Sequence, residues 1–454
     1  GPQHLVRDGL LPPELVAGNP EFLHPLVGIA PRGGHFLHFC AFELGRGPDG
    51  RWWVLGDRTQ APSGAGFALE NRVATLRAFP DLPEGVHVHR LAGFFRRFRD
   101  ALQELTGDPV RAVAILTPGP NNETYYEHAW IARYLGILLL EGEDLSVRDG
   151  QLMVRTVSGL QPISVLWRRL DAAFTDPLEL RPDSWIGTPG LVGVLRAGNA
   201  SIVNALGSGL VETRALAAFL PGICRGLHGD ELLLPGIATW WCGQDSAREQ
   251  VIADLDRMMI GPALSTQLPH DDMQATLLAG QLDPDDRAHL LQRLRDEGGQ
   301  WVAQEAVTLS TTPAYIDGRL EPRPFVLRAF AARTAQGWEV MPGGFARVGA
   351  HTDNRAIAMQ HGGQAADVWI VSARPVSQDT LLPMRQPTPR SAGTSELPSR
   401  AAENLLWLGR YAERSEAIAR VLRAYHARLA EQAQGQAPLL ELLAAHLLQL
   451  DVAV

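Results

Sequence analysis

The sequence has no lysine, because all 41 residues in its Lys+Arg total are arginine. Lysine is a compact charge on a flexible stem, whereas the guanidinium group of arginine is a rigid planar fork. Any phosphate clamp in this protein must therefore consist of arginine, metal ions and backbone N–H groups. A genome rich in G and C would explain arginine over the surface, but it would not restore a lysine clamp.

Cysteine is also scarce. Cys40, Cys224 and Cys242 stand alone without CxxC spacing, which gives no support to a zinc site and suits a reducing cytosol. No apolar run approaches the length of a membrane span, and the net charge of −9 argues against nonspecific binding of nucleic acid. These absences predict a cytoplasmic protein that has neither a membrane nor a nucleic acid as its partner.

The segment Trp53–Arg72 carries the most chemistry in the chain. A short apolar strand ends at Asp57-Arg58, a Pro62-Ser63-Gly64 turn follows, and Glu70-Asn71-Arg72 stands at the onset of a helix. Backbone N–H groups in a turn before a helix bind anions. The segment therefore combines charge, a tight turn and amide donors in one loop.

The remaining pattern of the 454 residues, 45% of them hydrophobic, indicates two or three domains. Residues 1–108 contain two candidate strands, Phe36–Phe42 and Trp52–Leu55, and a helical run at Leu91–Leu105. After them, strands alternate with a helix, which indicates a small parallel α/β layer. These elements are Val110–Leu116, Asn122–Leu135, Ile137–Leu140 and Val165–Trp167, followed by a second unit at Asn199–Asn204 with a helix near Thr213–Phe219.

The second half of the chain is expected to begin with a polar helical segment from Val251 to about Glu297, interrupted around Pro269-His270-Asp271-Asp272. Four strands separated by turn residues then predict one antiparallel sheet. They are Trp301–Leu309, Phe325–Phe330, Trp338–Met341 and Ala356–Met359. A linker rich in Pro, Ser, Thr and Gln covers residues 376–398, and Ser399–Ala430 has the apolar spacing of a long helix.

Several motifs stand along the chain in a fixed order. Beside Asp57–Gly64 and Glu70–Arg72, they are Thr117–His128, Arg168–Asp171, Gly198-Asn199, Val302–Glu305, Pro322–Pro324 and Met341–Val348. In type and order they resemble the circularly permuted ATP-grasp proteins, relatives of glutathionylspermidine synthase. The start of the last helix, Ser399–Arg414, resembles the opening of the helical alpha-E domain that accompanies this family.

The resemblance implies an α+β fold with an α/β part, in which strands from the C-terminal part of an ATP-grasp core have moved to the start of the chain. The implied division is 1–108 for the permuted metal and phosphate strands, 109–230 for an accessory Rossmann-like domain, 231–375 for the rest of the core, 376–398 for the linker and 399–454 for the alpha-E-like segment. The strands carrying Glu43 and Asp57 should then share one sheet or cleft with Trp301–Ile370.

The resemblance also implies ATP and Mg²⁺ as cofactors and assigns candidate site residues. Magnesium ligands would be Glu43, Asp57 and Glu70. The arginines that neutralise the phosphates would be Arg58, Arg323, Arg328 and Arg347. Nucleotide contacts would come from Ser63, Gly64, Asn71, Arg72, Gln304 and Glu305, and substrate contacts from Asn122, Glu123, Arg168, Arg169, Asp171 and Asn199.

The chain departs from the family pattern at three positions. Gly56 and Arg58 stand where two metal ligands are expected, and Ala366 stands where a lysine is expected. Structural alternatives also remain, because Asp57 with Arg58 could be a solvated turn and Arg168, Arg169 and Asp171 could be a structural ion-pair cluster.

Two functions therefore stay open. The first is an ATP-dependent carboxylate-amine ligase that acts on a peptide or amino acid through an acyl phosphate. The second is a degenerate ATP-grasp module that binds an alpha-E domain or a second, active ATP-grasp protein. The missing lysines and the two missing metal ligands favour the second function, and the intact Asp57–Gly64 and Glu70–Arg72 loops favour the first.

Overall fold

The structure is a computed structural model that describes residues 4–81, 86–107, 112–267, 276–353, 355, 363–377, 379, 397–431 and 438–450. Contacts within the chain divide it into two units. The larger unit comprises residues 1–153 and 162–388, and the smaller comprises residues 154–161 and 389–454. The candidate site lies entirely within the larger unit.

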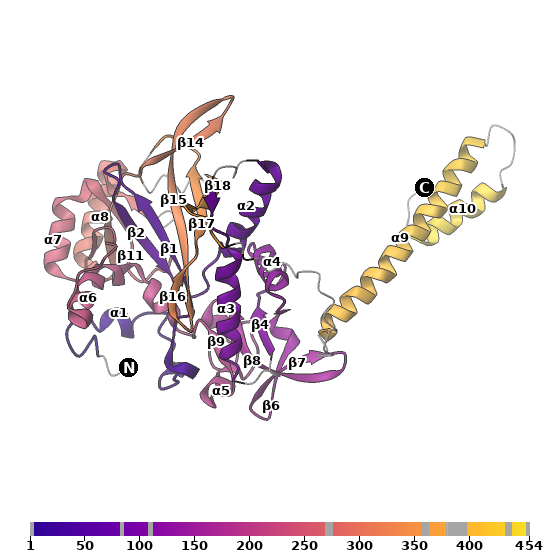
Figure 1. The fold of residues 1–454 in the computed structure, drawn as a ribbon, viewed down its shortest axis with the longest axis horizontal. Coiled ribbons are helices and arrows are strands. Elements are labelled where there is room, and N and C mark those ends of the chain that lie inside the picture. Colours follow the sequence, from indigo (N-terminus) through magenta and orange to yellow (C-terminus); the bar gives the residue numbers. More distant parts are fainter. Residues whose placement is uncertain are drawn as a thin grey trace. The chain divides into compact units, whose positions relative to one another are not determined.

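A seven-stranded sheet joins the start of the chain to its second half (Figure 1). Its main path runs β18 (Gly363–Trp369), β17 (Gly343–Gly349), β15 (Arg319–Thr334), β1 (Phe39–Arg46) and β2 (Trp52–Arg58). β14 (Thr311–Ile316) and β16 (Gly337–Val340) pair with β15 off this path. The antiparallel pairing of β1 with β15 confirms the expectation that the first strands share one sheet with the later region.

Two helices cover one face of this sheet: α2 (Ala65–Ala78) and α3 (Ala92–Glu104). Side chains of β1 alternate between the two faces of the sheet, so Phe39 and Ala41 face α2 and α3. These two residues pack there in an aromatic core with Phe94, Phe98 and Phe330. α3 closely matches the helix expected at residues 91–105. Figure 1 shows α2 and α3 on one side of the sheet and α7 (Asp245–Ala253) and α8 (Pro284–Asp296) on the other.

A six-stranded sheet contains the expected parallel layer. Its order is β5 (Leu138–Leu140), β4 (Ala112–Leu116), β8 (Gly159–Arg168), β7 (Gln151–Thr156) and β6 (Leu145–Arg148), with β9 (Ser201–Val203) beside β8. The pairs β4–β5, β4–β8 and β8–β9 are parallel, and α4 (Tyr125–Leu135) packs against β4 and β5. The helix expected near residues 213–219 is the short 3-10 helix η6 (Arg214–Ala218), followed by α6 (Leu220–His228).

A separate four-stranded sheet corrects two expectations. Its order is β10 (Thr239–Trp241), β13 (Trp301–Glu305), β11 (Met258–Pro262) and β12 (Leu277–Leu278). The segment 251–297 is therefore not helical throughout, because the buried residues of β11 pair with β13. Methionine is a good helix former, so pairing and burial override its propensity here. β13 also lies in a different sheet from β15 and β16, so the three described strands of the four expected in one sheet belong to two.

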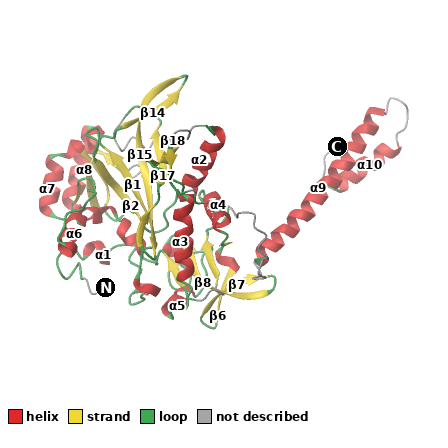
Figure 2. Cartoon of the chain, in the orientation of Figure 1, coloured by secondary structure: helices red, strands yellow, loops and turns green. Residues whose placement is uncertain are grey.

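The smaller unit ends in α9 (Ser399–Glu431) and α10 (Pro438–Gln449), which pack against each other (Figure 2). α9 confirms the long helix expected from residue 399, and Leu447 of α10 is fully buried. The expected strand Ala356–Met359 and most of the linker 376–398 lie outside the described residues. No helix among the described residues is both long and apolar enough to span a membrane.

Shorter elements complete the described chain. They are α1 (Glu14–Ala17), α5 (Leu191–Arg196), the paired strands β3 (His87–Val88) and β19 (Val371–Ser372), and the 3-10 helices η1 (His24–Leu26), η2 (Arg32–Gly34), η3 (Gly142–Asp144), η4 (Ala172–Phe174), η5 (Ser208–Glu212), η7 (Leu255–Arg257), η8 (Ala279–Gln281) and η9 (Gly298–Gln300).

Candidate functional site

The end of β2 separates two cavities. Successive side chains of a strand point to opposite faces of its sheet, so Asp57 and Arg58 face opposite ways. Asp57 pairs with Phe42 and Arg58 with Ala41, both on β1. Asp57 lines a large apolar cavity, whereas Arg58 lines a polar one. The dipeptide Asp57-Arg58 therefore places a carboxylate in the apolar cavity and a guanidinium group in the polar cavity.

The apolar cavity has a volume of about 720 Å³ and lies between the seven-stranded and four-stranded sheets. Leu55 and Ala329 line it from the first sheet, and Trp240 lines it from the second. Asp57, Thr239 and Gln304 supply the polar side chains among the described residues of its wall. The amide of Gln304 donates to the Thr239 hydroxyl at 3.3 Å and accepts from the buried Arg214 guanidinium at 3.3 Å.

The polar cavity has a volume of about 550 Å³. Its charged lining residues are Arg58, Glu123, Asp171, Glu212 and Arg328. Arg58 donates to the backbone carbonyl of Thr266 at 3.1 Å, which fixes one end of its guanidinium group. The cavity thus presents two guanidinium groups and three carboxylates to the same space, a combination that suits a ligand carrying both signs of charge.

The surroundings of the Asp57 carboxyl group disfavour its charged form. Burial, and next the nearby Glu212 carboxylate, raise the pKa of Asp57 from 3.8 to about 6. Burial also raises the pKa of Glu212, although Glu212 accepts hydrogen bonds from the backbone N–H groups of Thr59 and Gln60. The Glu212 carboxylate, which lines the polar cavity, is thus near enough to Asp57 to oppose its ionisation. Among the described residues, no cluster of three or more His, Cys, Asp or Glu side chains could hold a metal ion.

The raised pKa of Asp57 determines a pH dependence of stability. The folded protein holds this proton more tightly than the unfolded chain, so the stability contributed by Asp57 falls as the pH rises from about 4 to about 6. We therefore expect Asp57→Asn to melt at a higher temperature than wild type at neutral pH, with no difference near pH 4. Thermal melts of the ligand-free proteins across this range measure the difference, and a pH-independent difference would contradict the assignment.

Glu43 does not share a face with Asp57. It pairs in register with Arg328 of β15, and the two side chains form an ion pair in which Glu43 is 1% exposed. Arg328 also donates to the carbonyl of Ser63 at 2.9 Å. The expected pair of metal ligands, Glu43 and Asp57, is therefore divided by the sheet. Glu70 lies on α2 and is not among the described residues that line either cavity.

The predicted phosphate loop is occupied by a carboxylate of the protein itself. Glu127 accepts from the backbone N–H of Gly64 at 2.8 Å and from that of Gly66 at 3.3 Å. These amides stand at the N-terminus of α2, where the helix dipole attracts negative charge. Glu127 also pairs with Arg169 at 3.4 Å, and both side chains are buried. The Gly64 amide is thus used inside the fold, where the sequence suggested a nucleotide contact.

The remaining arginines expected in the phosphate clamp do not converge. Arg72 pairs with Asp367 at 2.7 Å and donates to the carbonyls of His89 and Val368, which ties α2 to β18. Arg323 pairs with Glu321 at 2.8 Å. Like Arg323, Arg347 of β17 and Asn71 of α2 are not among the described lining residues of either cavity. Of the four arginines assigned to the phosphates, Arg58 and Arg328 share the polar cavity.

The expected substrate contacts also divide. Glu123 and Asp171 line the polar cavity. Arg168 is fully buried and donates to the carbonyls of Leu170 and Gln60, so its geometry is that of a structural residue. The others bind within the protein: Arg169 pairs with Glu127, Asn122 accepts from the Thr124 N–H, and Asn199 donates to the Gly150 carbonyl. Glu305, which was expected to contact the nucleotide, pairs with Arg257.

Four polar lining residues of the polar cavity were missed by the sequence analysis. They are Gln60, Glu212, Thr266 and Gln267. Gln60 lies inside the quoted Asp57–Gly64 motif, so its position beside Arg58 was a usable signal. Glu212 follows a Gly-Ser-Gly turn without any spacing that marks it, and only folding brings it to the backbone of Thr59.

Comparison with known proteins gives two family matches. Residues 1–349 match the family model described as circularly permuted ATP-grasp type 2, and residues 397–450 match Alpha-E, described as an alpha-helical domain with a conserved ER motif. An uncharacterized protein of Synechocystis sp. is 33% identical over 373 residues, covering 82% of this chain and 76% of the relative. Two uncharacterized proteins of Mycobacterium tuberculosis are 33% and 34% identical, covering 82% and 93% of this chain and 67% and 47% of their own lengths.

Proposed function

Because this chain belongs to the circularly permuted ATP-grasp type 2 family, we propose that it is an ATP-dependent ligase that joins a carboxylate of a peptide or amino acid to an amine. ATP would supply the phosphoryl group that converts the acid into an acyl phosphate, which the amine then attacks. The observation that carries this proposal is a shared cavity. It is lined both by Asp57, which was assigned to the metal, and by Gln304, which was assigned to the nucleotide and lies in a distant part of the chain.

The apolar cavity has the character of a nucleotide base site. Ligand pockets are mostly apolar, with a few polar groups that fix orientation. Trp240, Leu55 and Ala329 supply apolar walls, while the amide of Gln304 offers donor and acceptor atoms to a base edge. A nucleotide whose base lies in this cavity would have its phosphates near the end of β2. There Asp57 and Arg58 lie on opposite faces of the seven-stranded sheet.

Asp57 fits a magnesium ion that arrives with the nucleotide, and the Glu212 carboxylate of the neighbouring polar cavity lies near enough to raise its pKa. Magnesium prefers oxygen ligands and in nucleotide sites is held by one or two carboxylates together with phosphate oxygens. A cation would relieve the unfavourable burial that raises the pKa of both carboxylates. The fold would keep both carboxylates in place before the nucleotide binds. The backbone N–H groups of Thr59 and Gln60 orient the Glu212 carboxylate by donating to it.

The polar cavity would hold the acid and the amine. Arg58 and Arg328 are positioned to bind a carboxylate and to neutralise charge that develops on its oxygens. Glu123 and Asp171 are exposed acids on the same wall, suited to an ammonium group of the second substrate. This arrangement favours an amino acid or a peptide, which carries both groups.

A second function is favoured by the occupied phosphate loop. Glu127 accepts the hydrogen bond of the Gly64 N–H, and Arg72 and Arg323 pair with carboxylates of the protein. Several groups expected to contact phosphate therefore already bind other residues of the chain. In this alternative the chain is a binding or assembly module for an alpha-E domain or a second ATP-grasp protein. Calorimetry separates the functions: magnesium-dependent ATP binding supports the ligase, and no binding at millimolar ATP supports the module.

A cavity-filling variant tests where the nucleotide binds. Ala329 lines the apolar cavity from β15, so Ala329→Trp should occupy the space of the base. We expect the ATP affinity in the presence of magnesium to fall at least about tenfold, measured by calorimetry. Leu320→Trp is the matched control, because Leu320 lies on the same strand and is 70% exposed. Equal affinities of Ala329→Trp and wild type would exclude this cavity as the base site.

A further inference from the structure

The polar cavity lies at one edge of the parallel part of the six-stranded sheet. β4, β8 and β9 are adjacent and parallel, so their carboxyl ends meet at the same edge, where open parallel sheets bind ligands. After each strand, the chain supplies one acid to the wall of the cavity. Glu123 follows β4, Asp171 follows β8 and Glu212 follows β9.

The order of the three strands sets the order of the three acids. β8 lies between β4 and β9, and neighbouring strands are about 4.8 Å apart, so the outer two are separated by roughly 10 Å. Glu123 therefore belongs to one end of the acidic row, Asp171 to its middle and Glu212 to its other end. A ligand that meets the whole row must extend along the sheet edge.

Negative charge exceeds positive charge in this cavity. Of its two lining guanidinium groups, that of Arg328 is already paired with the buried Glu43 carboxylate. The acidic row therefore sets three carboxylates against the single guanidinium group of Arg58 among the described lining residues. A ligand of net positive charge balances this excess better than a neutral zwitterion does.

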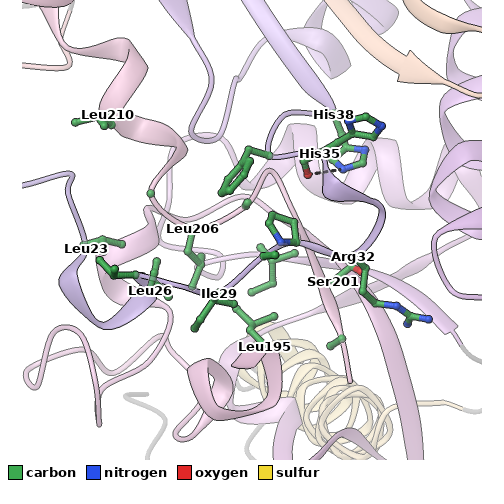
Figure 3. A pocket seen from close by; sticks show the side chains of 18 of the residues that line it. Leu23, Leu26, Ile29, Arg32, His35, His38, Leu195, Ser201, Leu206 and Leu210 are labelled. Carbon is green, nitrogen blue, oxygen red and sulfur yellow. Dashed lines mark hydrogen bonds between the residues drawn. The ribbon is translucent and has the colours of Figure 1, made fainter. Parts of the chain in front are cut away.

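A fourth carboxylate faces the acidic row from behind. Glu21 also lines a third cavity, of about 290 Å³, whose leucines Figure 3 shows: Leu23, Leu26, Leu195, Leu206 and Leu210. Its carboxylate, however, binds the Gln60 side chain, on the side of the polar cavity. Burial and then the carboxylates of Asp171 and Glu212 raise the pKa of Glu21, and the Arg168 guanidinium group has a smaller, opposite effect. The acids of this region thus repel one another, and an added cation relieves that repulsion.

Arg58 lies at the Glu212 end of the row. Burial raises the pKa of Glu212, whereas backbone hydrogen bonds and the charge of Arg58 lower it. The bond from Arg58 to the Thr266 carbonyl, 3.1 Å long, fixes the guanidinium group there. A ligand carboxylate bound to Arg58 therefore has Asp171 and then Glu123 ahead of it along the row.

From this arrangement we propose that the polar cavity binds a free basic amino acid, such as lysine, ornithine or arginine. Its α-carboxylate binds Arg58, its α-ammonium group binds Asp171, and its side-chain cation binds Glu123. An amino acid with a neutral side chain lacks the last contact, and an acidic one is repelled. This inference rests on the proposed function, because it names the substrate class of the cavity assigned there to the acid and the amine.

Calorimetric titration of the full chain without nucleotide tests the proposal with three probes. L-Lysine should bind at least about tenfold more tightly than L-norleucine, which has the same carbon chain but no side-chain cation. It should also bind about tenfold more tightly than L-lysinamide, which keeps both cations but lacks the carboxylate. No lysine binding at millimolar concentration, or lysine affinity equal to that of either other probe, would overturn the proposal.

Variants of the chain test the individual contacts. Glu123→Gln should weaken lysine about tenfold and leave norleucine unchanged, because it removes the charge that the side-chain cation meets. Glu123 is exposed, so this substitution should not disturb folding. Glu104→Gln is the matched control, because Glu104 is an exposed acid at the end of α3 outside the cavity wall. Arg58→Gln should remove the preference for lysine over lysinamide. Unchanged lysine affinity in Glu123→Gln would overturn the assignment.

Titration with ATP separates this proposal from the proposed function. Magnesium-dependent ATP binding without a preference for lysine would contradict the substrate assignment and leave the ligase standing. Preferential lysine binding by a protein that binds no ATP would support the assignment and contradict the ligase.

Discussion

Replacement of Asp57 with asparagine is expected to weaken magnesium-dependent ATP binding about a hundredfold, or roughly 2.7 kcal/mol, without destabilising the ligand-free protein at neutral pH. The amide keeps the size of the side chain and still accepts a hydrogen bond, but it removes a negative charge from the proposed cation site. It also removes the repulsion from Glu212, so the melting temperature should rise. Calorimetry with and without magnesium, together with a thermal melt, measures both effects.

Asp183→Asn is the matched control for this variant. Asp183 pairs with Arg181 at the surface and is 68% exposed, so the substitution should change neither nucleotide affinity nor melting temperature appreciably. A structural Asp57 would give the reverse of the expected result, namely a lower melting temperature with unchanged ATP affinity. That outcome would remove Asp57 from the metal site.

Replacement of Glu127 with glutamine is expected to destabilise the larger unit by about 3–5 kcal/mol, the usual cost of removing one partner of a buried ion pair. The glutamine can still accept from Gly64, but it leaves the Arg169 guanidinium, 2% exposed, without its countercharge. Two Arg169 nitrogens already lack hydrogen-bond partners among the described residues, so nothing nearby replaces the carboxylate. Equilibrium unfolding in urea measures the loss.

The double variant Glu127→Gln/Arg169→Met separates charge from capping. It removes the buried cation as well, so most of the lost stability should return. If the double variant is as unstable as Glu127→Gln, the loss comes from the cap of α2 instead, and the ion pair is not its cause.

The family could be predicted from the sequence because its motifs occur in a fixed order, and the match over residues 1–349 confirmed it. The permutation that this order implies predicted that the first strands share a sheet or cleft with residues 301–370, and the pairing of β1 with β15 shows a shared sheet. The extent of β11 could not be predicted in the same way. Its Met-Met-Ile-Gly-Pro sequence has no alternation, and only pairing with β13 makes it a strand.

The candidate site was harder to predict because motifs name residues but do not show which way they point. Glu43 and Asp57 stand on adjacent strands, yet a difference of one position in register places them on opposite faces. Glu127 was missed because it lies 63 residues from the Gly64 amide that it binds. Contacts over such separations depend on the folded chain and leave no local signal in the sequence.

The pairing of β1 with β15 has a consequence for biosynthesis. Glu43 and its partner Arg328 are separated by 285 residues, so the ribosome must complete most of the chain before the central strand pair can form. Until then the β1–β2 hairpin exposes an unpaired edge and an apolar face, a state that is prone to aggregate and slow to resolve. Production of this protein should therefore respond strongly to chaperone supply and to lower growth temperature.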